Sequence, residues 1–151
     1  MPEELAVASV CLLKRCYQSS CVQSYRFTRA SRLLIAREFG FVFDSPAYKA
    51  GNDHFLILAR ENELDRARVG FVFSKKNARL ATSRNMLRRM CREEFRLRQN
   101  TLPAVDIVVL TRRLQGEWTK AAVALKFAEL LTRIQSQYGK KHRSQNDTHP
   151  Q

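Results

Sequence analysis

The stretch from residue 83 to residue 99 constrains the fold more than any other part of the chain, because a helix built from it has two chemically distinct faces. Successive residues of a helix lie 100° apart, which gathers the apolar side chains on one side. These side chains are Met86, Leu87, Met90, Cys91 and Leu97, with Phe95 at the boundary. The opposite side carries Arg84, Asn85, Arg88, Arg89, Arg92 and Arg96. We therefore expect a helix that packs through one face and presents a cationic stripe on the other, with Thr82 or Ser83 as N-cap.

Three apolar runs of strand length accompany this helix. They are residues 54–60 (HFLILAR), 68–74 (RVGFVFS) and 106–111 (DIVVLT), in which Val, Ile and Phe are frequent. A short polar loop separates the first two runs and predicts a hairpin. The 83–99 helix separates the second run from the third, and a connection of this length predicts that these two strands are parallel.

Two further helices are predicted on either side of these elements. Phe39 and Phe43 are four residues apart in a short helix over 37–43, which ends ahead of Pro46. A longer helix over 117–138 has Gly139 as its expected stop. Its apolar positions are Val123, Phe127, Leu130, Leu131, Ile134 and Tyr138. The order α-β-β-α-β-α favours an α+β fold, a two-layer sandwich in which a small mixed β-sheet has helices packed on one side.

The chain divides into three segments by composition. Its 151 residues leave room for one hydrophobic core, which we place in an α+β domain over 26–138. Residues 1–25 show no clear period and are expected to be a poorly ordered N-terminal extension. Residues 139–151 are basic and polar and are expected to be a disordered tail.

The charge is concentrated in one part of the sequence. The formal net charge is +13, and residues 68–99 contribute +8 of it, from ten Lys and Arg against two Glu. An excess of this size favours an anionic partner, that is nucleic acid, an anionic membrane surface or an acidic protein. Because the excess lies inside the predicted domain rather than in a tail, it favours a nucleic-acid surface. No apolar run approaches the roughly 18 residues of a membrane span.

The spacing of the cysteines and histidines supports neither a metal site nor a nucleophilic site. Cys11, Cys16, Cys21 and Cys91 match no standard zinc or redox spacing, and the three histidines are scattered. Residues 5–13 are apolar but follow two glutamates rather than the basic residues of a signal peptide. We expect reduced thiols and a cytoplasmic location.

The segment from Ser74 to Gln99 has the chemistry of a phosphate-binding surface. Arg84, Arg88 and Arg92 recur every four residues and form a ridge about 12 Å long. Guanidinium groups match phosphate oxygens, and the positive end of a helix adds to the attraction. Asn85 can donate or accept at a sugar hydroxyl or a base edge.

This segment resembles the protein subunit of bacterial ribonuclease P. The family signature is a strand ending in Ser-Lys-Lys, then a helix with Arg-Asn-Arg, a basic pair, Arg-Glu and Phe. Here it stands as Ser74-Lys75-Lys76, Arg84-Asn85-Met86, Arg88-Arg89, Arg92-Glu93 and Phe95. The resemblance covers about residues 30–138 and includes the residues 39–43 and 106–109. Met86 replaces the second arginine of the triplet, so one expected cation is missing.

The resemblance implies a left-handed β-α-β crossover and a role in removing the 5′ leader of precursor tRNA. The catalyst would be the RNA subunit, with Mg²⁺ held mainly by the RNA and the substrate, and no catalytic or metal-binding residue in the protein. The residues that the resemblance implies for binding of the catalytic RNA are Lys75, Lys76, Arg84, Asn85, Arg88, Arg89 and Arg92. The residues that the resemblance implies for the cleft that binds the single-stranded leader are Phe39, Phe43, Phe55, Phe71 and Phe73. The implied partners are ribonuclease P RNA and the precursor tRNA leader, with no membrane and no obligate protein partner.

Two other classes of function stay open at this point. A ribosomal or chaperone-type RNA-binding protein has the same charge distribution. A DNA-binding module would place the Arg-rich helix in a major groove, although a strand rather than a first helix precedes it here.

Overall fold

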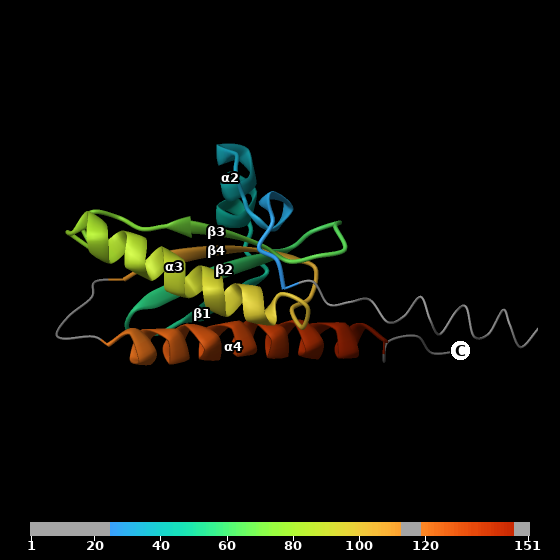
Figure 1. Cartoon of the computed structure of the whole chain (residues 1–151). Helices are drawn as coiled ribbons and strands as arrows, with labels where there is room; N and C mark the ends of the chain where they lie inside the picture. Colours follow the sequence, from blue (N-terminus) through green and yellow to red (C-terminus); the bar gives the residue numbers. More distant parts are fainter. Residues whose placement is uncertain (1–24, 113–118, 147–151) are drawn as a thin grey trace, which may run out of the picture.

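The computed structural model describes residues 25–112 and 119–146. A 3-10 turn, η1 (Arg29–Ser31), precedes helix α2 (Ala36–Asp44). Strands β1 (Tyr48–Gly51), β2 (Phe55–Glu61) and β3 (Arg68–Val72) come next. Helix α3 (Ala81–Arg98), strand β4 (Val105–Thr111) and helix α4 (Lys120–Asn146) complete the fold (Figure 1). No helix in these ranges is long and apolar enough to cross a membrane.

The four strands form one mixed sheet in the order β1-β2-β4-β3. β3 and β4 are parallel, with Val69 opposite Ile107, which confirms the predicted parallel pair joined by a helix. The predicted hairpin between β2 and β3 is wrong, because β4 lies between them and pairs with both. Residues 105–109 of β4 are all buried, and a strand that is apolar on both sides belongs in the middle of a covered sheet. β1 is absent from the predicted elements, since YKAG carries no strand pattern.

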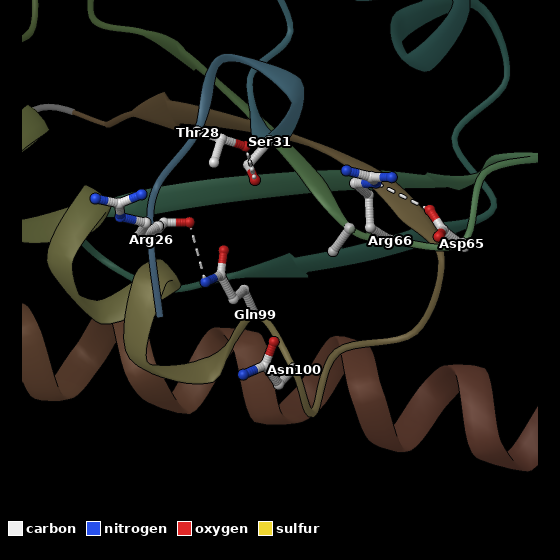
Figure 2. Close-up of a pocket in the computed structure, with 8 residues that line it drawn as sticks. Arg26, Thr28, Ser31, Asp65, Arg66, Gln99 and Asn100 are labelled. Carbon is white, nitrogen blue, oxygen red and sulfur yellow. Dashed lines mark hydrogen bonds and ion pairs between the residues drawn. The ribbon is translucent and has the colours of Figure 1, made fainter. Parts of the chain in front are cut away.

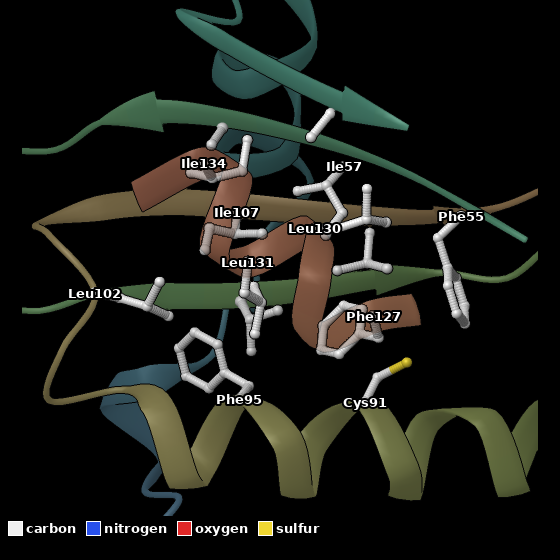
Figure 3. Close-up of a cluster of buried hydrophobic side chains, with 14 of the residues drawn as sticks. Phe55, Ile57, Cys91, Phe95, Leu102, Ile107, Phe127, Leu130, Leu131 and Ile134 are labelled. Carbon is white, nitrogen blue, oxygen red and sulfur yellow. The ribbon is translucent and has the colours of Figure 1, made fainter. Parts of the chain in front are cut away.

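The larger hydrophobic core lies between the sheet and helices α3 and α4 (Figure 3). The predicted apolar face of α4 is confirmed: five of its six positions are buried and Tyr138 packs beside them. On α3 the buried line is Leu87, Cys91 and Phe95, four residues apart. Phe95 is thus fully buried rather than at a boundary, and Leu97, about 200° further around the helix, is 49% exposed.

Helix α2 packs on the opposite face of the sheet, so the helices are divided between both faces rather than packed on one (Figure 1). The small cluster beneath α2 consists of Leu33, Val42, Leu58 and Val108. Strand side chains alternate between faces, which is why neighbours of Leu58 and Val108 face α3 and α4 instead. Gly70 allows the ring of Phe39 to rest directly on β3, because a Cβ at this position would overlap with that ring.

Helix α4 extends beyond its predicted end at Tyr138 and continues to Asn146, so residues 139–146 are helical rather than a disordered tail. One contact with the sheet and one within the helix stabilise the extra turns. Lys141 Nζ lies 2.9 Å from Glu61 Oε1 of β2, and the ring centroid of His142 lies 4.1 Å from that of Tyr138 on α4 itself. Tyr48 also donates its hydroxyl to Glu61 Oε1 at 2.5 Å. Residues 1–24, 113–118 and 147–151 lie outside the described residues, and the predictions for the two termini stay predictions there.

We expect Glu61→Gln to lower stability at neutral pH and to have less effect in acid. The hydrogen bonds from Lys141 and Tyr48 hold the pKa of Glu61 below its usual value. The stability that this shift provides is present above the unfolded-state pKa of about 4.3 and is lost as pH falls through the lower folded-state pKa. The expected loss is about 1 kcal/mol or less, because Glu61 is partly exposed and solvent screens the pair. Urea unfolding at pH 7 and pH 3 measures it, with exposed Glu63→Gln as control; an equal loss at both pH values would contradict the assignment.

Candidate nucleic-acid interface

The loop between β3 and α3 is held in place by hydrogen bonds to its backbone. α3 begins at Ala81 with Leu80 as N-cap, two residues ahead of the predicted cap, and no side chain caps it. Arg84 Nη1 instead donates to the carbonyl oxygens of Ala78 and Arg79, at 2.7 and 2.9 Å. Arg84 therefore organises the loop, while Lys75 and Lys76 on the same loop are exposed.

The cationic stripe of α3 divides into a paired part and an unpaired part. Arg96 and Arg98 form ion pairs with Glu93 and Glu94 on the same helix. Among the described residues, no ion pair involves the N-terminal members of the stripe. These members are Arg88, Arg89 and Arg92, together with Arg84, whose guanidinium binds the loop carbonyls, and Asn85 lies exposed beside Arg84. The cations of α3 without an ion pair among the described residues therefore lie at or before Arg92, ahead of the paired Arg96 and Arg98.

Arg32, which precedes α2, joins this group. The guanidinium groups of Arg32 and Arg92 lie over the same ring, that of Phe27, at 4.9 and 5.4 Å. Arg88 lies over the ring of Phe73 at 5.8 Å. Burial and the charges of Arg32, Arg88 and Arg89 lower the pKa of Arg92. Four crowded cations repel one another, and a bound anion would relieve that repulsion.

The aromatic residues predicted for a leader cleft do not share one face of the sheet. Phe55 is fully buried under α4, with its ring 5.7 Å from that of Phe127, and Phe73 is 7% exposed in the same core. Both predictions are therefore wrong, because residues 55 and 73 have the strand parity that faces α3 and α4. Phe39 and Phe43 lie on α2, with Phe43 41% exposed.

Among the strand residues that face α2, the apolar ones are aliphatic rather than aromatic. They are Leu56, Leu58, Val72, Val108 and Leu110, with Gly70 beside them. Leu56 and Leu110 are only partly buried, and Val72 is 38% exposed. The accessible apolar surface beside α2 thus combines Phe39 and Phe43 with Leu56, Val72 and Leu110, which no sequence pattern singled out.

A cavity of about 260 Å³ at the outer edge of β3, here the β3-edge cavity, connects the two faces. Its lining is Phe27, Arg32, Leu33, Leu34, Phe39, Val69, Gly70, Phe71, Arg88 and Arg92. It brings Arg88, Arg92, Phe39 and Phe71 together as predicted site residues. Phe27 is new to the site, since residues 25–33 follow no helix or strand period.

A second cavity of about 310 Å³ lies near the C-terminal end of α3 and is lined mostly by polar residues (Figure 2). Arg26 and Arg66 line it, but Arg66 Nε already pairs with Asp65 Oδ1 at 2.9 Å. Gln99 donates its side-chain amide to the carbonyl oxygen of Arg26 at 3.3 Å. The carboxylate makes this cavity less favourable to an anion than the β3-edge cavity.

Arg68 fixes the position of α2 on the sheet. Its Nη1 donates to Glu38 Oε1 at 2.5 Å, while Nε and Nη2 donate to the two carboxylate oxygens of Asp106 at 2.8 and 2.6 Å. Glu38 Oε2 accepts the backbone N–H groups of Leu34 and Ile35. Burial opposes ionisation of Glu38, but these N–H groups and Arg68 outweigh it and lower its pKa. The Phe39 side of the β3-edge cavity is therefore anchored to β3 and β4.

Comparison with known proteins places this chain in a family. A family model described as Ribonuclease P matches residues 27–135. The ribonuclease P protein component of Pseudomonas aeruginosa is 48% identical over 108 residues, which cover 72% of this chain and 80% of that protein. The component from Azotobacter vinelandii is 46% identical over 108 residues, covering 72% and 83%.

Solved structures similar to this chain belong to the same family. The RNase P protein from Thermotoga maritima, in complex with 1-(4-fluorophenyl)-2-thiourea, is 35% identical with a TM-score of 0.59, covering 68% of this chain and 99% of that one. A Staphylococcus aureus RNase P protein mutant with defective mRNA degradation activity is 25% identical with a TM-score of 0.64, covering 69% and 87%. The predicted α+β class is confirmed. From its sheet, its Arg-rich crossover helix and these relatives, the chain belongs to the ribonuclease P protein family, whose members are protein components of an endoribonuclease acting on tRNA precursors.

Proposed function

We propose that this chain binds the catalytic RNA of ribonuclease P through α3 and the loop before it. The residues assigned to this contact are Lys75, Lys76, Arg84, Asn85, Arg88, Arg89 and Arg92, with Arg32 added. The observation that carries the proposal is the crowding of Arg32, Arg88, Arg89 and Arg92 without a carboxylate partner among the described residues. Phosphate groups of a folded RNA supply the missing negative charge and match the guanidinium fork.

The 5′ leader of the precursor tRNA is assigned to the sheet face beside α2. Phe39 and Phe43 keep their predicted role, and Leu56, Val72 and Leu110 replace the strand phenylalanines. Aromatic rings stack on unpaired bases with little sequence preference, which suits leaders of variable sequence. Phe71 contributes at the β3-edge cavity instead.

The chemistry of cleavage is assigned to the RNA. Among the described residues, no group of three or more His, Cys, Asp and Glu side chains lies together in a way that suits a metal ion. From the family resemblance, Mg²⁺, which stabilises the attacking and leaving oxygens in phosphoryl transfer, is assigned to the RNA and the substrate. The protein binds and orients both, and we place this activity in the cytoplasm, where precursor tRNA is the substrate.

A competition experiment tests the choice of partner. The purified chain is bound to P. aeruginosa ribonuclease P RNA, and unlabelled competitors are added at matched salt concentration. We expect the complex to survive excess duplex DNA and excess ribosomal RNA fragments. Preferential displacement by duplex DNA would favour a DNA-binding module, and equal affinity for ribosomal RNA would favour a general RNA-binding protein.

Phe43→Ala is expected to raise the KM for a precursor tRNA with a long leader about 5- to 50-fold, because one base loses its stacking partner. Binding of the RNA subunit should not change, since Phe43 lies on the other face of the sheet from α3. The measurement compares precursors with a long leader and a one-nucleotide leader, with exposed Leu125→Ala as control variant. An equal rise for both substrates would show that Phe43 does not contact the leader.

A further inference from the structure

The β3-edge cavity lies between the surface assigned to the RNA subunit and the surface assigned to the leader. We propose that it holds one unpaired nucleobase of the ribonuclease P RNA, with the adjoining phosphate on the arginines at its rim. This inference rests on the proposed function and adds a site for a base to a surface otherwise assigned to phosphates.

The cavity walls are suited to a flat aromatic group. Phe27, Phe39 and Phe71 line it from three different segments, and Leu33 and Val69 close its apolar floor. The ring of Phe27 is packed edge-on against that of Phe95 at 5.9 Å, which fixes its orientation. The guanidinium groups of Arg32 and Arg92 already lie over this ring, so the surface offered to a base combines those guanidinium planes with the rings of Phe39 and Phe71.

The cationic groups at the cavity rim favour an anion beside that aromatic group. Arg32 and Arg92 both lie over Phe27, and Arg88 lines the same cavity. Arg92 Nε is buried and has no hydrogen-bond partner among the described residues. A buried N–H without a partner is costly, so a ligand with an acceptor oxygen is favoured here. A nucleotide combines a flat base with such oxygens, which an aromatic side chain of a protein does not.

The size and the exposed strand edge favour a single base. A volume of about 260 Å³ is just below the ~300 to 1,000 Å³ of typical small-molecule sites and is too small for a helical segment of RNA. β3 is an edge strand, and the Leu33 N–H donates to the Val69 carbonyl oxygen at 3.1 Å. Outward-pointing backbone groups recur at every second residue of a strand, so Phe71 offers the next N–H and C=O to the edge of a bound base.

Two variants test the proposal with full-length protein and P. aeruginosa ribonuclease P RNA. Phe27→Leu removes the ring over which Arg32 and Arg92 lie and keeps an apolar side chain of similar reach. Leu34→Trp adds bulk at the cavity wall, where Leu34 is 53% exposed and its replacement leaves the core intact. Leu125→Trp, on an exposed position of α4, is the matched control. Circular dichroism establishes folding, and the Kd is measured over a series of salt concentrations.

We expect Phe27→Leu and Leu34→Trp each to weaken RNA binding about 5- to 20-fold, with Leu125→Trp unchanged. The slope of log Kd against log salt should stay the same, because neither variant removes a cation. Unchanged affinity, or a smaller slope, would overturn the proposal; if Phe27→Leu does not fold, Leu34→Trp alone decides. The double variant Arg88→Ala with Arg89→Ala distinguishes the base site from the proposed RNA-binding function. If the double variant weakens RNA binding while the cavity variants do not, the base site is refuted and the proposed function stands.

Discussion

Replacing Arg88 and Arg89 together by alanine is expected to weaken binding of ribonuclease P RNA about 10- to 100-fold near 0.15 M salt and to reduce its salt dependence. Each lost phosphate contact lowers the magnitude of the slope of log K against log salt by roughly one unit or slightly less, so the double variant should lose about two units or less. Both arginines stand on the part of α3 where the described residues provide no carboxylate partner. Their removal should therefore cost RNA affinity rather than fold stability.

The matched control removes the same charge elsewhere. Arg133→Ala with Lys140→Ala takes two cations from exposed positions of α4. Its salt slope should stay close to that of the parent chain if only the α3 face touches RNA. Equal slopes for the two double variants would mean that net charge, rather than the α3 surface, governs binding.

Arg68→Met is expected to lower the free energy of unfolding by about 2–4 kcal/mol, because it leaves the carboxylates of Glu38 and Asp106 close together without a cation. Breaking a fully buried ion pair by removing one partner costs about 3–5 kcal/mol. The expected loss is somewhat smaller here, since these three side chains are 13 to 22% exposed. Urea unfolding measures the loss, and α2 should be the element whose amide protons lose most protection.

Two further variants make this prediction specific. Asp106→Asn should destabilise the parent chain but stabilise the Arg68→Met variant, since it then removes an unpaired charge. Arg66→Met, two residues earlier, breaks a pair whose side chains are 53 and 80% exposed and should cost about 0.5 kcal/mol or less. The same sign for Asp106→Asn in both backgrounds would mean that Arg68 does not pair with Asp106 in solution.

The elements with strong hydrophobic periodicity could be predicted from the sequence, and the sheet order could not. The buried positions of α4 and the parallel pairing of β3 with β4 follow from spacing and connection length. The central place of β4 depends on pairing with β2, some fifty residues away, which local pattern does not encode. Similarly, alternation shows that Phe55 and Leu56 face opposite ways, but only the packed structure decides which face α2 covers.

The candidate site was predictable where it lies on one helix. Arg88, Arg89 and Arg92 share a face because of helical geometry alone, and the resemblance to the family predicts RNA as their ligand. Arg32 and Phe27 come from a segment without periodicity that runs beside α3, held by the hydrogen bond from Arg96 to the carbonyl oxygen of Tyr25. Their part in the site depends on that tertiary contact, so sequence pattern could not reveal it.

The most direct test of the account is processing of a precursor tRNA by P. aeruginosa ribonuclease P RNA at low Mg²⁺ concentration. Three reactions are compared: RNA alone, RNA with the parent chain, and RNA with the Arg88→Ala and Arg89→Ala variant. We expect the parent chain to raise the rate of leader removal. At the same concentration, the variant should lose most of this increase in rate. No gain in rate or in substrate affinity with the parent chain would contradict the central claim.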